Sequence, residues 1–217
     1  VIKVIGVGGA GVNAIDQMIR TGIRNVEFLV AHTNAQALRR SLAKQRIQLG
    51  RAGLGAGARP EVGRSAALES RAQLIEALKG ANMVFIVAGL GGGTGTGAST
   101  VIAELAHGLG QLPLAAVMMP FQFEDHRTKT AESGIADLRK YVDSPIVLSN
   151  KSAVEVIGEN GPVIDAFKET NELLCHTVGG ITDLINFPSL VCLDFEDVRA
   201  VMSLSGFATA ASACAIG

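Results

Sequence analysis

The stretch Gly91-Gly92-Gly93-Thr94-Gly95-Thr96-Gly97 joins a predicted strand to a predicted helix. The strand is the apolar run Met83 to Ala88, and the helical pattern covers Ser99 to Leu109. Glycines let a backbone wrap closely around phosphates, threonine hydroxyls donate hydrogen bonds, and the following helix N-terminus carries partial positive charge. The stretch is therefore predicted to bind a polyphosphate, and a merely flexible loop is the alternative.

A second glycine motif, Gly6-Val7-Gly8-Gly9-Ala10-Gly11, precedes a helical pattern that covers Asn13 to Arg20. It fits the GxGxxG fingerprint of dinucleotide-binding units. That fingerprint also needs an acidic residue at the end of the second strand, where this chain has His32, Thr33 and Asn34. An NAD-dependent oxidoreductase is therefore the weaker alternative. The Walker pattern GxxxxGK[ST] does not occur, so backbone, helix dipoles and a metal must meet the phosphate charge.

Continuous apolar runs separated by helical patterns predict an α/β fold with a mostly parallel, Rossmann-like sheet and helices on both faces. The predicted strands lie at 1–7, 26–31, 83–88, 114–119 and 144–148, and a further short helix lies at 35–42. The glycine-rich segment from Gly50 to Gly63 is predicted to be a loop.

A long helix is predicted from Pro162 to Asn186, about 25 residues or roughly 37 Å at 1.5 Å per residue. An acidic loop from Asp194 to Asp197, a helix at 198–204 and a small-residue strand follow it. The predicted organisation is a nucleotide-binding domain at 1–161, the long helix at 162–187, and a segment at 188–217 that leads into a truncated second domain.

Composition excludes several classes of protein. Among 217 residues, 19 are basic and 20 acidic, so no broad electrostatic footprint for nucleic acid or an anionic membrane is visible. No apolar run reaches the roughly 20 residues that a membrane span requires. The cysteines, Cys175, Cys192 and Cys214, lack CxxC spacing, which suits reduced thiols in a cytoplasmic protein. A start at Val1 and an end at Gly217 lead us to expect a fragment of a longer chain.

The sequence GGGTGTG at 91–97 resembles the signature loop of the FtsZ/tubulin family of GTPases. Other segments extend the resemblance across nearly the whole chain: 6–14, 53–63 (GLGAGARPEVG), 120–124 (PFQFE), 165–174 (DAFKETNELL) and 193–202 (LDFEDVRAVM). The resemblance implies a GTPase domain that binds GTP or GDP with Mg²⁺ and assembles head to tail into division filaments. It also implies division or membrane-tethering partners that bind the missing C-terminal part.

The resemblance further implies which residues bind the nucleotide. The first glycine motif would line it, the loop at 57–58 would lie near the terminal phosphate, and the loop at 91–97 would hold the phosphates. Glu124 and Arg127 would contact ribose and phosphate. Asn150 and Phe167 would flank guanine, and Asn171 and Glu172 would read its edge. The implied set is Gly8, Gly9, Ala10, Asn13, Gly57, Ala58, Gly91, Gly92, Gly93, Thr94, Gly95, Thr96, Gly97, Glu124, Arg127, Asn150, Phe167, Asn171 and Glu172.

The sequence gives a chemical reason for the role of one of these residues and an alternative role for two others. The Glu172 carboxylate suits guanine because it can accept from both the N1 and N2 donors, which adenine lacks. Phe167 could instead pack in the core on the apolar face of its helix. Glu124 could be an ordinary solvated carboxylate in a loop.

Asp194 and Asp197 are the candidate catalytic residues, because carboxylates can position the water that attacks GTP. Glu172 and Asn186 are fourteen positions apart on the long helix, which is about 21 Å. We therefore expect the aspartates to act on the nucleotide of the next subunit, in a head-to-tail contact that forms an open filament. As the alternative, Asp197 caps a helix that begins at Val198.

Some positions depart from the family pattern. Cys192 stands where Asn is usual, and Glu172 stands where Asp is usual. His32 and Asn34 replace Asn and Asp, and Arg59 replaces Asn. These changes put hydrolysis in doubt more than binding, so an FtsZ-like nucleotide-binding filament protein with weak or no GTPase activity is the second candidate function.

Overall fold

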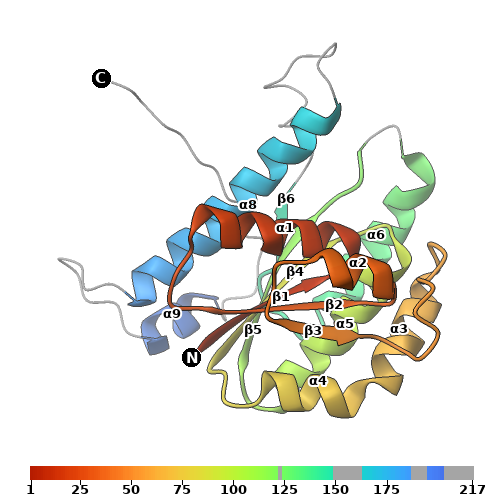
Figure 1. The fold of residues 1–217 in the computed structure, drawn as a ribbon. Coiled ribbons are helices and arrows are strands. Elements are labelled where there is room, and N and C mark those ends of the chain that lie inside the picture. Colours follow the sequence, from red (N-terminus) through yellow and green to blue (C-terminus); the bar gives the residue numbers. More distant parts are fainter. Residues whose placement is uncertain (122–123, 149–162, 187–194, 203–217) are drawn as a thin grey trace.

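Six parallel strands form one sheet in the order β3-β2-β1-β4-β5-β6 (Figure 1). This is a computed structural model, which describes residues 1–121, 124–148, 163–186 and 195–202. The strands are β1 Ile2–Val7, β2 Glu27–His32, β3 Gln45–Gln48, β4 Met83–Gly89, β5 Leu112–Met118 and β6 Ile146–Leu148. The predicted α/β fold with a parallel, Rossmann-like sheet is confirmed.

Helices cover both faces of the sheet because the inner strands are apolar on both sides. The helices are α1 Gly8–Thr21, α2 Ala35–Arg40, α3 Pro60–Glu69, α4 Arg71–Leu78, α5 Gly93–Gly108, α6 Asp125–Leu138, α8 Val163–Asn186 and α9 Phe195–Met202. Helices α1, α2 and α8 pack on the face that contains Val4 and Phe85. Helices α3 to α6 pack on the face that contains Ile5 and Ile86.

Several predicted boundaries were wrong, and glycine is the common cause. Helix α1 begins at Gly8 rather than Asn13, and α5 begins at Gly93 rather than Ser99. Helix α3 begins at Pro60, inside the segment predicted to be a loop. Glycine has low helix propensity, so a pattern based on propensity begins a glycine-rich helix too late. Pro60 at the first helical position is a normal start for α3.

Some elements had no sequence prediction, namely β3, α3, α4 and α6. The long helix α8 occupies 24 residues, in agreement with the predicted span. Helix α9 begins at Phe195, three positions before the predicted start. The predicted acidic loop, apart from its helical end, and the final strand lie outside the described residues. Within the described part of the chain, no helix is long and apolar enough to cross a membrane.

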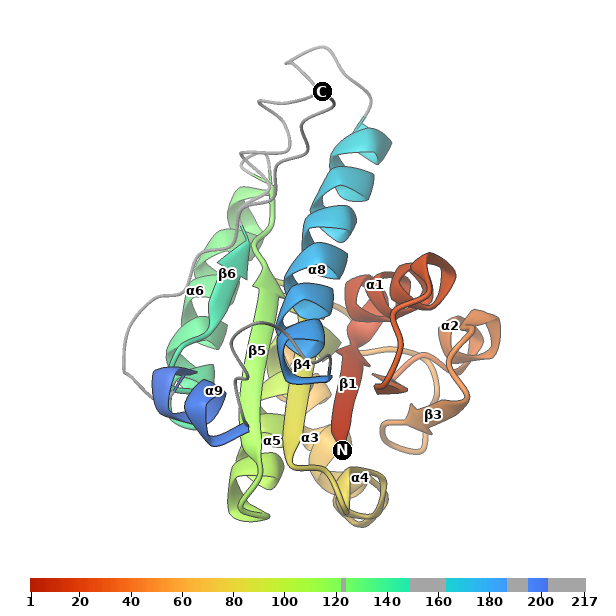
Figure 2. The ribbon, with the colours of Figure 1, turned by 90° about the vertical axis from the view of Figure 1, so that its left-hand side faces the viewer.

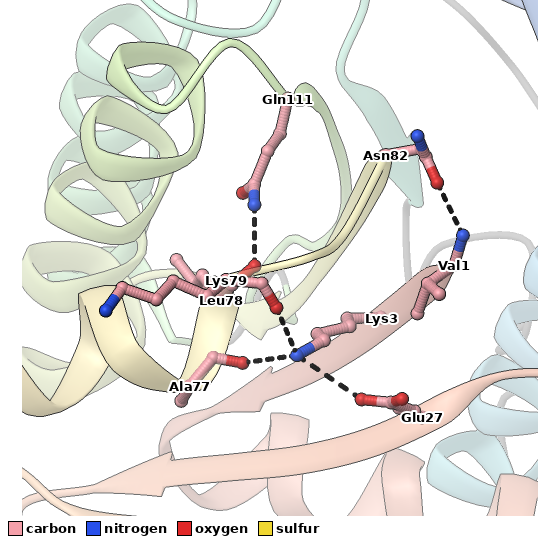
Figure 3. Close-up of polar contacts among 8 residues, drawn as sticks. All are labelled: Val1, Lys3, Glu27, Ala77, Leu78, Lys79, Asn82 and Gln111. Carbon is pink, nitrogen blue, oxygen red and sulfur yellow. Dashed lines mark hydrogen bonds and ion pairs between the residues drawn. The ribbon is translucent and has the colours of Figure 1, made fainter.

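Lys3 joins the beginning of the sheet to the end of α4 (Figure 3). Its side chain is only 9% exposed, and Nζ donates to the carbonyls of Ala77 at 2.8 Å and Lys79 at 2.9 Å. Glu27 on β2 lies 3.3 Å from the same ammonium group. The last carbonyls of a helix have no partner within it, so this buried cation stabilises the C-terminus of α4. The arrangement fixes the end of the sheet opposite the glycine motifs.

Candidate functional site

The N-termini of α1 and α5 meet where β1 and β4 end, and neither is capped by a side chain. The residues before the two helices, Val7 and Gly92, make no side-chain hydrogen bond to the first turn. The first backbone N–H groups of a helix have no partner within it, and the helix dipole adds partial positive charge there. Two such ends side by side form a binding site for an anion.

The two glycine motifs pack directly against each other. Gly8 has a φ of +74°, which favours glycine, and a methyl group at this position would lie 2.9 Å from the backbone N of Gly95. A methyl group at Gly89, the last residue of β4, would lie 2.6 Å from the Cβ of Ala10. A side chain at Gly8 would push α1 and α5 apart, and one at Gly89 would push α1 away from the end of β4. The glycines therefore bring the two helix N-termini together, and the two motifs form one cradle.

A cavity of about 380 Å³ opens over this cradle. It lies at the carboxyl ends of the strands, where the strand order changes direction between β1 and β4, which is the usual ligand position in an open α/β sheet. Its size is within the range of small-molecule sites. Its lining is Gly9, Ala10, His32, Ala56, Ala58, Gly89, Leu90, Gly92, Gly93, Thr94, Gly95, Met118, Met119, Pro120, Glu124, Arg127 and Phe167.

The threonine hydroxyls in the cradle hold the loop itself. The Oγ1 atoms of Thr94 and Thr33 share a hydrogen bond of 2.6 Å, and Thr96 Oγ1 accepts one of 2.9 Å from the N–H of Gly91. Both side chains in the loop are buried. The sequence had led us to expect hydroxyl groups that donate to phosphates. In the structure these hydroxyls make hydrogen bonds that fix the shape of the loop, and Thr94 also lines the cavity, while their donation to phosphates stays a prediction.

Glu124 and Arg127 form a pair at the side of the cavity next to α6. Glu124 Oε1 accepts from Arg127 Nη1 at 2.6 Å, and its Oε2 accepts from the N–H of Phe121 at 3.2 Å. Glu124 is thus bound on both oxygens, which differs from a merely solvated carboxylate. The Arg127 side chain is 54% exposed, so its guanidinium can still reach an anion in the cavity.

Phe167 on α8 lies at the same side of the cavity and is 47% exposed. Its ring meets that of Phe121 edge to face, with centroids 4.8 Å apart and an angle of 81° between the planes. A ring that is half exposed differs from the core packing that was the alternative. The free face of Phe167 is available to stack on a planar ligand.

Asn171 and Glu172 lie one helical turn beyond Phe167, and neither lines the cavity. Asn171 is four positions from Phe167, so it lies on the same face of α8, and it is half-buried. Glu172 is five positions away, roughly 140° around the helix, and it is exposed. Of the two residues predicted to read the guanine edge, Asn171 shares the face of α8 that carries Phe167, and Glu172 does not.

His32 ends β2 and lies at the other side of the cavity. Its Nδ1 accepts a hydrogen bond of 3.1 Å from the N–H of Asn34. Burial lowers the pKa of His32 below its ordinary value, because a charged imidazolium loses solvation there. Asn34 caps α2 through its side chain, which accepts from two backbone N–H groups of that helix.

The structure brings about half of the predicted nucleotide-binding residues to the cavity. The predicted residues that line it are Gly9, Ala10, Ala58, Gly92, Gly93, Thr94, Gly95, Glu124, Arg127 and Phe167. Those outside the lining are Gly8, Asn13, Gly57, Gly91, Thr96, Gly97, Asn171 and Glu172. Gly8, Gly91 and Thr96 shape the cradle from behind. Asn150 and Asp194 lie outside the described residues.

Asp197 lies far from the cavity of its own chain. It stands in the first turn of α9, and α9 lies at the end of the sheet where β1 and β5 begin (Figure 2). Arg199 of the same helix donates to the carbonyl of Gly110, just before β5, at 3.4 Å. Because α9 begins at Phe195, Asp197 is within the helix rather than at the cap of a helix that starts at Val198.

Sequence reasoning missed the apolar part of the lining and the role of the β2 end. Met118 at the end of β5 lines the cavity, and so do Ala56, Leu90, Met119 and Pro120 in the loops that follow β3, β4 and β5. Strand ends in a parallel sheet meet at one edge, so residues directly after each predicted strand were the available signal. The sequence singled out His32 because it stands where a dinucleotide fold has an acid and where the family pattern has Asn, and neither observation gave it a contact with the nucleotide.

Comparisons with known proteins give one consistent result. The family model described as Tubulin/FtsZ family, GTPase domain, matches residues 1–158. Over its whole length the chain is 47% identical to a protein of Pseudomonas putida named Cell division protein FtsZ, and 46% identical to one of Neisseria gonorrhoeae with the same name. The chain spans 56% of the length of each of these relatives.

Solved structures show the same similarity. An FtsZ dimer of M. jannaschii, described as empty, superimposes with a TM-score of 0.90 at 40% identity, over 95% of this chain and 61% of that one. A GTPγS-bound protofilament of CetZ2 from Haloferax volcanii gives a TM-score of 0.82 at 21% identity, over 95% of this chain and 64% of that one. At that lower identity the match concerns the fold alone.

Proposed function

This chain belongs to the tubulin/FtsZ family, and on that premise we propose that it binds a guanine nucleotide in the cavity over α1 and α5 and hydrolyses GTP during head-to-tail assembly. One observation carries the proposal. The N-termini of α1 and α5 meet, neither is capped by a side chain, and the glycines between them have no room for side chains. Such a cradle suits the phosphates of a nucleotide.

The lining of the cavity supports an orientation for the nucleotide. The phosphates lie over Gly9 and Gly93 to Gly95, where the backbone N–H groups of the two helices are. The base lies against Phe167, whose exposed ring is part of the lining. Arg127 is between these ends and meets a phosphate oxygen, while Glu124 keeps the guanidinium in place.

Mg²⁺ would be held at this site by the phosphates of the bound nucleotide. Within the described residues, no group of three or more His, Cys, Asp and Glu side chains is arranged to hold a metal ion. Mg²⁺ commonly keeps several waters and binds through substrate phosphates. When bound, the ion would neutralise charge on the transferred phosphoryl group.

Hydrolysis needs residues from a second copy of the chain. Asp197 lies at the amino-terminal end of the strands, opposite the cavity, and Asp194 comes just before α9 in the sequence (Figure 2). The Asp197 carboxylate can reach a nucleotide only if that end of one subunit sits on the cavity of the next. Such a contact uses two different surfaces, so it repeats without closing and produces a filament.

The relatives named as cell division proteins extend the proposal to a role in division. Since the chain spans 56% of their length, the activity of the whole protein, its cytoplasmic location and its division or membrane-tethering partners belong to the proposal as well. The FtsZ-like protein with little turnover remains the second candidate, because Cys192 and Glu172 depart from the family pattern.

The test is GTP turnover and polymer sedimentation measured together for wild type and Asp194→Ala. We expect turnover per subunit to rise with protein concentration in the wild type, and Asp194→Ala to bind GTP without hydrolysing it. Asp143→Ala is the matched control, because it removes an exposed carboxylate just before β6, at the same end of the sheet. Unchanged turnover in Asp194→Ala would contradict the mechanism, and polymer without turnover in the wild type would favour the second candidate.

Complementation tests the use of two subunits directly. A Gly93→Ala variant with a damaged cradle still supplies Asp194, and an Asp194→Ala variant still binds GTP. We expect a mixture of the two to hydrolyse GTP faster than either alone. Two variants that stay inactive when mixed would contradict catalysis across a subunit contact.

A further inference from the structure

His32 is a titratable side chain in the cavity that the proposed function has not used. It extends from the end of β2, and its Nε2 lies above Gly9 in the first turn of α1, since a methyl group at Gly9 would be 3.8 Å from that atom. Nδ1 accepts the N–H of Asn34, so a neutral ring carries its hydrogen on Nε2. The imidazole therefore presents a hydrogen-bond donor to the cavity.

The backbone around His32 is held on three sides. The carbonyl of His32 accepts from Leu49 at 2.9 Å, and the carbonyl of Thr33 accepts from Gly55 at 3.1 Å. Thr33 also contacts Thr94 of the cradle through its hydroxyl at 2.6 Å. His32 is thus fixed relative to α5 and to the loop that contains Ala56 and Ala58. A donor fixed in this way loses little entropy when it binds a ligand.

His32 and Phe167 lie at opposite ends of the cavity. In the sheet order, β2 and β5 are three strand intervals apart, which is about 14 Å at about 4.8 Å per interval. Phe167 contacts Phe121, which follows β5, so a base stacked on Phe167 is on the β5 side. A nucleotide that lies across the two helix N-termini then directs its last phosphate toward β2.

We propose that His32 contacts the terminal phosphate of GTP, donating a hydrogen bond from Nε2–H to one of its oxygens, and that this contact makes the site prefer GTP over GDP. The inference rests on the proposed function, because it takes a guanine nucleotide in the cavity as given. It adds a residue that recognises the phosphate chain length.

The imidazole acts in its neutral form. Protonation would place a hydrogen on Nδ1 and remove the hydrogen bond from Asn34, which is part of the turn that begins α2. Burial disfavours the charged form as well. Among the described residues that line the cavity, the other charged ones, Glu124 and Arg127, are paired with each other next to α6. Near pH 8, His32 therefore remains a neutral donor.

The experiment compares affinities for GDP and for a GTP analogue that is not hydrolysed, in the wild type, His32→Met and His32→Gln. Met fills similar space without a donor, whereas Gln restores an N–H group. Losing a hydrogen bond to a charged oxygen should weaken the binding of the GTP analogue by about tenfold to a hundredfold in His32→Met. Binding of GDP should change by less than about twofold, and Gln should restore part of the preference.

The outcomes separate the two proposals. Equal losses for both nucleotides would show that His32 only supports the loop, and unchanged affinity for both would show that it is no contact; either result overturns the inference. A wild type that binds neither nucleotide would overturn the proposed function itself.

Nitrogen-15 NMR of the imidazole at pH 8 gives an independent readout. We expect Nδ1 to stay unprotonated and the Nε2–H signal to shift and exchange more slowly with the GTP analogue than with GDP. A doubly protonated ring in the complex, or identical spectra with both nucleotides, would overturn the inference.

Discussion

Gly93→Ala tests the cradle most sharply, because the structure gives the size of the clash. A methyl group at position 93 would lie 2.7 Å from the Cβ of Ala56 and 2.8 Å from both the N and O atoms of Arg59. Ordinary carbon contacts are about 3.5 to 4.0 Å. The start of α5 and the loop at 56–59 would therefore have to separate by several tenths of an ångström or more.

The expected cost follows from two opposing effects. Overpacking of this kind costs about 1–3 kcal/mol, whereas Ala in place of Gly within a helix gains up to about 1 kcal/mol. A net loss of about 1–2 kcal/mol should lower Tm by roughly 2–8 °C in a chain of this size. Displaced N–H groups should also weaken GDP binding at least about tenfold, since a hydrogen bond to a charged group contributes about 1.5–3 kcal/mol.

Gly108→Ala is the matched control, because it lies at the end of the same helix and nothing would come within 4 Å of its methyl group. Thermal unfolding and a titration with fluorescent GDP should give wild-type values or a slightly higher Tm for this variant. If Gly93→Ala matched Gly108→Ala in both assays, the close packing of loop and helix could not be what forms the cradle.

Three further predictions concern single side chains. Phe167→Ala should weaken GDP binding about tenfold, because stacking on a base contributes about 1–3 kcal/mol. Tm should change little because the ring is half exposed, and an unchanged affinity for GDP would contradict the stacking role. Lys3→Met should lower the free energy of unfolding in urea by about 1–3 kcal/mol, because two carbonyls lose their donor. The control Lys79→Met removes an exposed ion pair and should lower it by less than about 1 kcal/mol, and equal losses would refute the role of Lys3. Burial raises the pKa of the Cys175 thiol to about 11. The stability that this thiol contributes should therefore be complete below its ordinary pKa and lost as the pH rises toward 11. Alkylation mapped by mass spectrometry should leave Cys175 unmodified at pH 8 unless the chain is unfolded.

The sequence predicted the sheet better than the helix boundaries. Runs such as Met83 to Ala88 are apolar throughout, which is the pattern of a strand that is buried on both faces. The starts of α1 and α5 were hidden because glycines that must be small for close packing are also poor helix formers. Tertiary packing of the backbone determines those starts, and propensity carries no information about it.

Local spacing predicted one part of the site, and contacts between distant parts of the sequence hid the rest. Glycine motifs after strands indicate a phosphate site from local spacing alone, so Gly9 and Gly92 to Gly95 were found and do line the cavity. The hydrogen bond between Thr33 and Thr94 could not be predicted, because the two residues are remote in the sequence and meet only through the parallel sheet. The position of Asp197 opposite the cavity likewise depends on how α8 crosses the sheet.

Calorimetric titration with GDP, ADP and NAD would show which ligand the cavity over α1 and α5 accepts. We expect GDP to bind at least about a hundredfold more tightly than ADP or NAD, since a site built for guanine leaves its buried polar groups unpaired with adenine. Binding of NAD or ADP that equals or exceeds the binding of GDP would contradict it.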